Sequence, residues 1–219
     1  MRHEAKGSPS PSPGQAVRMA TMKRGKAPDH YTQRAKKEGY PARSVFKLEE
    51  INQKQRIVKK GATVLDVGAA PGSWSLWLGR TLGADARIVA VDLKPLDIGV
   101  RPANITEING DLYEHDTQDR ITAAGPYDAV VSDAAPATTG NRSVDTSRSA
   151  SLVEFLIYML PSWLAPGGSF VAKLYQGGDE QRLLAQLRTQ FNSAKLFKPK
   201  ASRKDSFETF LIGIGYRKE

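Results

Sequence analysis

Four aspartates stand at or just beyond the ends of short apolar segments, where a carboxylate can bind a ligand. They are Asp66, Asp92, Asp111 and Asp133. If the apolar segments are parallel strands of one sheet, these carboxylates lie near its ligand-binding edge, beyond the carboxyl ends of the strands. Asp92 can accept hydrogen bonds from both hydroxyls of a ribose, and Asp111 suits an amine donor such as the edge of adenine. The pattern predicts a ligand that contains a nucleoside.

The segment GAAPGSW at residues 68–74 connects the first of these apolar segments to a predicted helix. Its small residues allow a ligand to approach the backbone, and the start of a helix offers free N–H groups. The segment lacks the third glycine of the dinucleotide-binding motif, and no P-loop motif occurs in the chain. A dinucleotide and a nucleoside triphosphate are therefore disfavoured as ligands, while an ordinary strand–helix turn remains the alternative.

The composition excludes several kinds of chemistry. The 219 residues include no cysteine and only three histidines, at positions 3, 30 and 115. Disulfides, cysteine zinc sites, iron–sulfur clusters and thiol nucleophiles are excluded, and we predict no metal site. No apolar run approaches the roughly 18 residues of a membrane span, and residues 1–30 contain no signal-peptide core. We expect a cytoplasmic protein that does not bind membranes.

Charge is unevenly distributed along the chain. The net charge is +9, from 32 basic and 23 acidic residues. Basic residues outnumber acidic ones in residues 1–60 and 182–205, whereas acidic residues dominate residues 61–181. If the two basic flanks share a face, that face attracts a polyanion. Solvated surface lysines are the alternative interpretation.

The apolar periodicity predicts an α/β fold. Short runs that are apolar on both faces, typical of buried parallel strands, occur at residues 63–67, 87–92, 129–133 and 169–174. Helical patterns follow at residues 73–82, 151–164 and 179–191, the second bent or ended near Pro161. A last run at residues 208–216 follows a strand candidate at residues 195–197 after only a loop, so it should pair antiparallel. We predict a doubly wound, mostly parallel sheet with an antiparallel last strand.

Two regions precede the predicted sheet. Residues 1–28 are rich in Ser and Pro and are predicted to be a disordered tail. Residues 29–219 are predicted to form a single domain that includes a basic helical extension at residues 29–60. In that extension Ser44 suits a helix N-cap, and Val45, Leu48 and Ile51 fall on one stripe of a helix.

Several blocks of the chain resemble the FtsJ/RrmJ family of RNA ribose 2′-O-methyltransferases. The blocks occur in the family's order across about residues 29–217. They are RSVFKL at residues 43–48, DVGAAPGSW at 66–74, SDAAP at 132–136, APGGSFVAK at 165–173, QG at 176–177, and SR and SFE at 202–203 and 206–208. The resemblance implies a class I methyltransferase fold of the Rossmann-like type, with S-adenosyl-L-methionine as the methyl donor.

The resemblance also implies roles for particular residues. A catalytic tetrad falls by position on Lys47, Asp133, Lys173 and Glu208. Cofactor contacts fall on Gly72, Trp74, Asp92, Asp111 and Asp133. A ribose hydroxyl is a poor nucleophile, so the protein must align it with the methyl group and stabilise charge at the oxygen. Lys173, in an otherwise apolar strand, can do this either as a neutral general base or as a charged stabiliser.

The implied substrate is large-subunit (23S) ribosomal RNA, methylated at a uridine. The first alternative is tRNA methylated in its anticodon loop, because residues 29–44 also resemble the start of that branch of the family. A non-catalytic RNA-binding ribosome-assembly factor is a weaker alternative, and an NAD-dependent oxidoreductase is weaker still. RNA is thus the expected partner, bound through the basic flanks and through Tyr31 or Tyr40 as stacking groups, by a protein that is expected to be a monomer.

Overall fold

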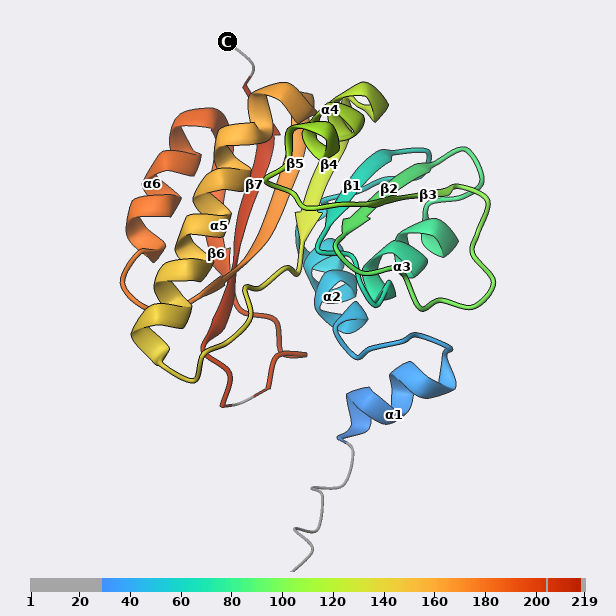
Figure 1. The fold of residues 1–219 in the computed structure, drawn as a ribbon, viewed down its shortest axis with the longest axis horizontal. Helices are drawn as coiled ribbons and strands as arrows, with labels where there is room; N and C mark the ends of the chain where they lie inside the picture. The colour runs from blue at the N-terminus through green and yellow to red at the C-terminus, as the bar shows by residue number, and fades with distance from the viewer. Residues whose placement is uncertain (1–28, 204, 218–219) are drawn as a thin grey trace, which may run out of the picture.

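The computed structural model describes residues 29–203 and 205–217, so the predicted tail at residues 1–28 lies outside the described residues. A seven-stranded sheet forms the centre of the fold (Figure 1). Its order is β3-β2-β1-β4-β5-β7-β6. The strands are β1 (Thr63–Val67), β2 (Arg87–Asp92), β3 (Ile105–Asn109), β4 (Tyr127–Ser132), β5 (Leu164–Tyr175), β6 (Phe191–Phe197) and β7 (Glu208–Tyr216).

The strand directions confirm the predicted doubly wound sheet. Strands β1 to β5 pair in parallel with one another, and β7 pairs antiparallel with both β5 and β6. The chain proceeds from β1 outward to β3 and then returns to place β4 on the other side of β1. This reversal leaves a crevice beyond the carboxyl ends of β1 and β4, which is where ligands bind in open α/β sheets.

Helices cover both faces of the sheet (Figure 1). One cluster of buried apolar side chains joins the sheet to α2 (Val45–Gln55) and α3 (Ser73–Thr81), and α1 (His30–Lys37) adds Ala35 to it. A second cluster on the other face joins the sheet to α4 (His115–Ala124), α5 (Arg142–Trp163) and α6 (Glu180–Gln190). Within the described ranges, no helix is long and apolar enough to cross a membrane.

The stripe predicted on α2 is buried as expected. Val45, Leu48 and Ile51 are fully buried, and they hold α2 against the sheet so that Lys47 points toward its carboxyl edge. Ser44 occupies the N-cap position, but its side chain makes no capping hydrogen bond. Instead, its backbone carbonyl accepts a hydrogen bond of 2.9 Å from the indole N–H of Trp74.

Two helices differ from the sequence expectation. Helix α5 begins at Arg142, well before residue 151, because Asn141 caps it by accepting hydrogen bonds from the backbone N–H groups of Ser143 and Val144. It ends at Trp163, just after Pro161 as predicted. Helix α4 was not predicted at all. Only Thr117 and Ile121 are buried on it, so its apolar stripe is too sparse to produce a helical pattern.

Candidate active site

The four residues of the predicted tetrad lie together, although they are far apart in the chain. Lys47 comes from α2, Asp133 follows β4, Lys173 lies on β5 and Glu208 begins β7. The Nζ atom of Lys47 is 2.8 Å from Oε1 of Glu208 and 3.7 Å from Oδ1 of Asp133. The Nζ atom of Lys173 is 3.1 Å from the same Oδ1. Two cations and two carboxylates thus form one continuous chain of ion pairs.

Burial makes these contacts strong. The side chains of Lys47, Lys173 and Glu208 are each about one-tenth exposed, and charges so placed are screened only weakly by solvent. Burial by itself raises the pKa of Glu208, but the charge and hydrogen bond of Lys47, with smaller contributions from Ser202 and Lys173, outweigh it and hold that pKa below its ordinary value. Glu208 is therefore ionised at neutral pH.

A cavity of about 500 Å³ opens beside the tetrad at the crevice between β1 and β4. Its wall includes Asp92, Asp111 and Asp133, three of the five predicted cofactor residues, together with Lys173 of the tetrad. Gly68 and Ala70 bring the backbone of the predicted loop into the same wall. Both the volume and the mixture of apolar and acidic groups suit a nucleoside-containing ligand.

The loops around the cavity hold its carboxylates in place. Asp92 accepts hydrogen bonds from the backbone N–H groups of Ala70 at 3.0 Å and Lys94 at 2.9 Å. Asp111 accepts one from the N–H of Tyr113 at 3.0 Å. These bonds fix the direction of each carboxylate before a ligand arrives, which lowers the entropic cost of binding.

The other two predicted cofactor residues, Gly72 and Trp74, do not line this cavity. Gly72 packs against the β2–β3 loop, where a Cβ atom would lie 2.3 Å from Cγ2 of Ile98. The side chain of Trp74 is only 2% exposed and stacks on Phe210. With its hydrogen bond to Ser44, Trp74 joins α3 to α2 and so supports the position of Lys47.

Asp66 also differs from the other strand-end aspartates. It is 1% exposed, does not line the cavity, and accepts a hydrogen bond of 2.5 Å from the hydroxyl of Ser75 on α3. Burial, together with the charges of Asp133 and Asp92, raises the pKa of Asp66 to about 7. Its position indicates a link between β1 and α3 rather than a direct ligand contact.

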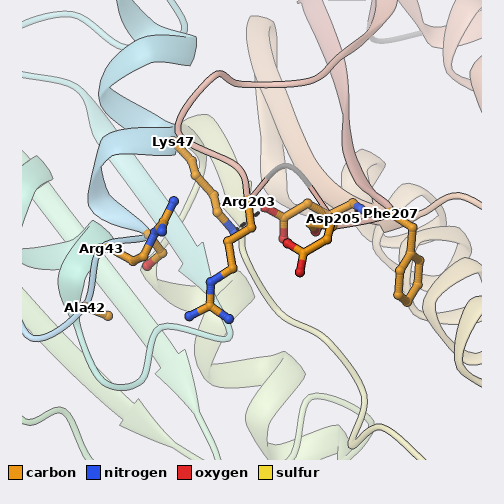
Figure 2. Close-up of a pocket in the computed structure, with 9 residues that line it drawn as sticks. Ala42, Arg43, Lys47, Arg203, Asp205 and Phe207 are labelled. Carbon is orange, nitrogen blue, oxygen red and sulfur yellow. Dashed lines mark hydrogen bonds and ion pairs between the residues drawn. The ribbon is translucent and has the colours of Figure 1, made fainter. Parts of the chain in front are cut away.

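A second cavity, of about 400 Å³, lies on the other side of the tetrad. Lys47 and Glu208 contribute to its wall, as do Arg43, Arg203 and Phe207. In Figure 2, Arg43 and Phe207 lie at opposite ends of this cavity, with Lys47 and Arg203 between them. The tetrad therefore separates the two cavities, since Asp133 and Lys173 line one and Lys47 and Glu208 line the other.

Sequence reasoning missed some of the residues that line the two cavities. Leu93 and Leu112 directly follow Asp92 and Asp111, so their position after a strand was a usable signal. Leu152 comes from α5 and carries no such signal, because only the packing of that helix brings it to the cavity.

A model of the FtsJ-like methyltransferase family matches residues 40–216. The chain belongs to this family. A relative from Treponema denticola, named ribosomal RNA large subunit methyltransferase E, is 49% identical over 87% of this chain and 96% of its own length. A relative of the same name from Desulforapulum autotrophicum is 44% identical over 85% of this chain and 92% of its own.

Solved structures agree with this assignment. A chain from Plasmodium falciparum, assigned as a ribosomal RNA methyltransferase, matches with a TM-score of 0.71 and 26% identity, covering 82% of this chain and all of that one. Fibrillarin from Aeropyrum pernix matches in fold alone, with a TM-score of 0.53 and 16% identity, over 72% of this chain and 68% of that one. The predicted fold, the methyltransferase activity and S-adenosyl-L-methionine as donor are confirmed.

Proposed function

We propose that this methyltransferase methylates the ribose 2′-hydroxyl of a uridine in large-subunit ribosomal RNA. The relatives that share most of its length are named ribosomal RNA large subunit methyltransferase E. The observation that carries the chemistry is the position of the tetrad between two cavities, one lined by Asp92 and Asp111 and the other by Arg43 and Arg203. The first cavity, the donor cavity, suits S-adenosyl-L-methionine, and the second cavity suits a nucleotide of the RNA.

The charged side chains of the tetrad lie between the two cavities. When bound, S-adenosyl-L-methionine supplies an activated methyl group. The protein's part is to hold the RNA hydroxyl in line with that group and to stabilise negative charge on the oxygen. Lys173 is placed for this, because it lines the donor cavity and contacts Asp133. Glu208 and Asp133 together hold Lys47, which lines the second cavity, proposed for the RNA nucleotide.

Lys173 acts in its charged form in this proposal. Its Nζ atom donates to the backbone carbonyl of Asp133 and lies 3.1 Å from the carboxylate of the same residue, so an ammonium group has two acceptors there. The ammonium stabilises the negative charge that develops on the oxygen, while Asp133 keeps it directed at the reacting atom, and the hydroxyl proton passes to water. A kcat that rises through the alkaline range would show that a neutral amine is the active form and that Lys173 is a general base.

The experiment that tests the function is transfer of a labelled methyl group to three substrates. These are large ribosomal subunits that lack the modification, naked large-subunit RNA and bulk tRNA. We expect label in the ribosomal substrates and at a single uridine 2′-oxygen after mapping. Label confined to tRNA would favour the anticodon-loop alternative, and binding of ribosomal particles without transfer would favour an assembly factor.

Three features of the working enzyme follow as proposals. We expect residues 29–219 to act as one domain, with the tail at residues 1–28 outside it. We expect a monomer, because both cavities and all four tetrad residues come from one chain. Light scattering during gel filtration measures this directly. For an enzyme that acts on ribosomal RNA we also expect a location in the cytoplasm.

A further inference from the structure

Tyr175 and Phe207 form an aromatic pair beside the tetrad. Their ring centroids are 4.8 Å apart, and the planes are tilted by 55°. Phe207 immediately precedes Glu208 and lines the second cavity with it. Tyr175 lies opposite Glu208 in the β5–β7 register and two residues after Lys173, so it projects from the same face of β5 as that lysine. The pair is therefore adjacent to the place where the methylated nucleotide must lie.

The pair does not belong to the hydrophobic core. Both rings are only half-buried, and neither is part of the two clusters of buried side chains or of the partly buried groups packed against them. Hydrogen bonds other than the ring contact also hold the β6–β7 loop, since the N–H of Gln176 donates to the carbonyl of Phe207 at 2.8 Å. Lys198 adds a bond of 2.7 Å to the carbonyl of Ser206.

A cation covers one part of this pair. The guanidinium carbon of Arg142, at the start of α5, lies 5.2 Å from the ring centroid of Phe207. Among the described residues, Arg142 is exposed and has no hydrogen bond or ion pair that competes with this contact. A planar guanidinium and a nucleobase stack on an aromatic ring in the same way, so a base can replace Arg142 on the ring or insert beneath it.

We propose that Tyr175 and Phe207 form a platform on which a nucleobase of the RNA substrate stacks, with Arg142 covering the stacked base. This inference rests on RNA as the substrate in the proposed function. The tyrosines that the sequence offered for stacking are less suited, because Tyr31 and Tyr40 pack against Phe46. Burial, with further contributions from Glu208 and Asp133, raises the pKa of Tyr175, so its hydroxyl stays protonated as a hydrogen-bond donor beside the base.

The test separates stacking from phosphate binding. We would measure the affinity of wild type and Phe207→Leu for a short labelled oligouridine and for an abasic ribose-phosphate strand of equal length. Phe207→Leu keeps an apolar side chain but removes the ring. We expect it to weaken oligouridine binding by about tenfold, a usual size for one stacked base, and to leave abasic binding unchanged. Phe207→Trp should restore the affinity for oligouridine.

A matched control is Tyr158→Leu, which removes an exposed ring from α5 far along the helix from Arg142. It should change neither affinity. Equal losses for both strands in Phe207→Leu, or no loss for oligouridine, would overturn the platform. The readout does not depend on turnover. If the wild type failed to methylate ribosomal RNA yet showed the expected binding pattern, the proposed function alone would fail.

Discussion

The contact between Lys173 and Asp133 lies in the wall of the donor cavity, which both residues line. Lys173 reaches both the carboxylate and the backbone carbonyl of Asp133. Asp133 Oδ1 is buried and has the two lysine ammonium groups, of Lys173 and Lys47, as its charged neighbours. A change at Lys173 therefore removes a charge from the reacting position and leaves Asp133 with one cationic neighbour.

Lys173→Ala should reduce methyl transfer by about two to four orders of magnitude, because a charge that stabilises the transition state is lost. Binding of S-adenosyl-L-methionine should change by only a few-fold, since Asp92 and Asp111 remain in the donor cavity. Single-turnover transfer assays and calorimetry measure the two quantities. Arg188→Ala on α6, away from both cavities, is the control. Turnover near that of wild type would contradict the assignment of Lys173.

At the scale of elements, the loop between β1 and α3 shapes the donor cavity. Gly68 has a φ of +72° and lies so close to Ala134 that a Cβ atom would approach the Cβ of Ala134 to 2.4 Å. Ala134 follows Asp133 and lines the donor cavity. Glycine at residue 68 thus allows the loops after β1 and β4 to meet.

Gly68→Ala should destabilise the protein by about 2–4 kcal/mol, the sum of left-handed backbone strain and overpacking. It should also weaken binding of S-adenosyl-L-methionine, because Ala134 must move. Gly61→Ala is a matched control, with a φ of +74° and no atom within 4 Å of the added Cβ, so it reports the strain alone. Urea unfolding and calorimetry compare the two variants. Equal effects would show that the contact with Ala134 is unimportant.

Asp66, which links β1 to α3, makes the stability of the folded protein depend on pH. The pKa of Asp66 is about 7 in the folded protein and ordinarily 3.8. Between these values the folded state holds a proton that the unfolded state has released, so the contribution of Asp66 to stability falls as pH rises. The fall is at most about 1.4 kcal/mol per pH unit and stops above pH 7.

The measurement is the difference in the free energy of unfolding between wild type and Asp66→Asn from pH 5 to pH 8. An asparagine cannot ionise, so the variant should gain stability relative to wild type as the pH rises toward 7. Asp119→Asn, at an exposed position on α4, reports the effect of removing a charge alone. A difference that does not change with pH would rule out this role for Asp66.

At the scale of the whole molecule, the net charge of +9 favours binding of RNA, which is a polyanion. The basic flanks precede and follow the acidic centre of the chain, and Arg43 and Arg203, one from each flank, line the same cavity. In Figure 1, α2 and the β6–β7 loop lie at the same edge of the sheet. The fold thus brings basic residues from both flanks together around the tetrad.

The affinity for RNA should therefore fall steeply with salt. The logarithm of the association constant should decrease linearly with the logarithm of salt concentration, by about tenfold or more between roughly 50 and 200 mM, because bound phosphates release counterions. Filter binding with large-subunit RNA measures the slope. Binding of S-adenosyl-L-methionine, which carries little net charge, is the internal control. A flat titration with RNA would contradict an electrostatic interface.

The sequence by itself determined most of the strands and the family. The bounds of β1, β2 and β7 match the predicted runs, because a strand buried on both faces needs a continuous apolar segment wherever it lies. The antiparallel direction of β7 followed from the loop before it, which is too short for a crossover. The family motifs pointed to the tetrad by position.

Only the tertiary structure decided which residues meet. The contact between Lys47 and Glu208 depends on α2 packing beside β7, and no local pattern encodes that distance. Tertiary packing likewise removed the side chain of Trp74 from the donor cavity and, through α5, brought Leu152 into it. It also placed Tyr175 against Phe207. Periodicity reports which face of an element is buried, whereas the neighbours on that face are set by how the elements pack.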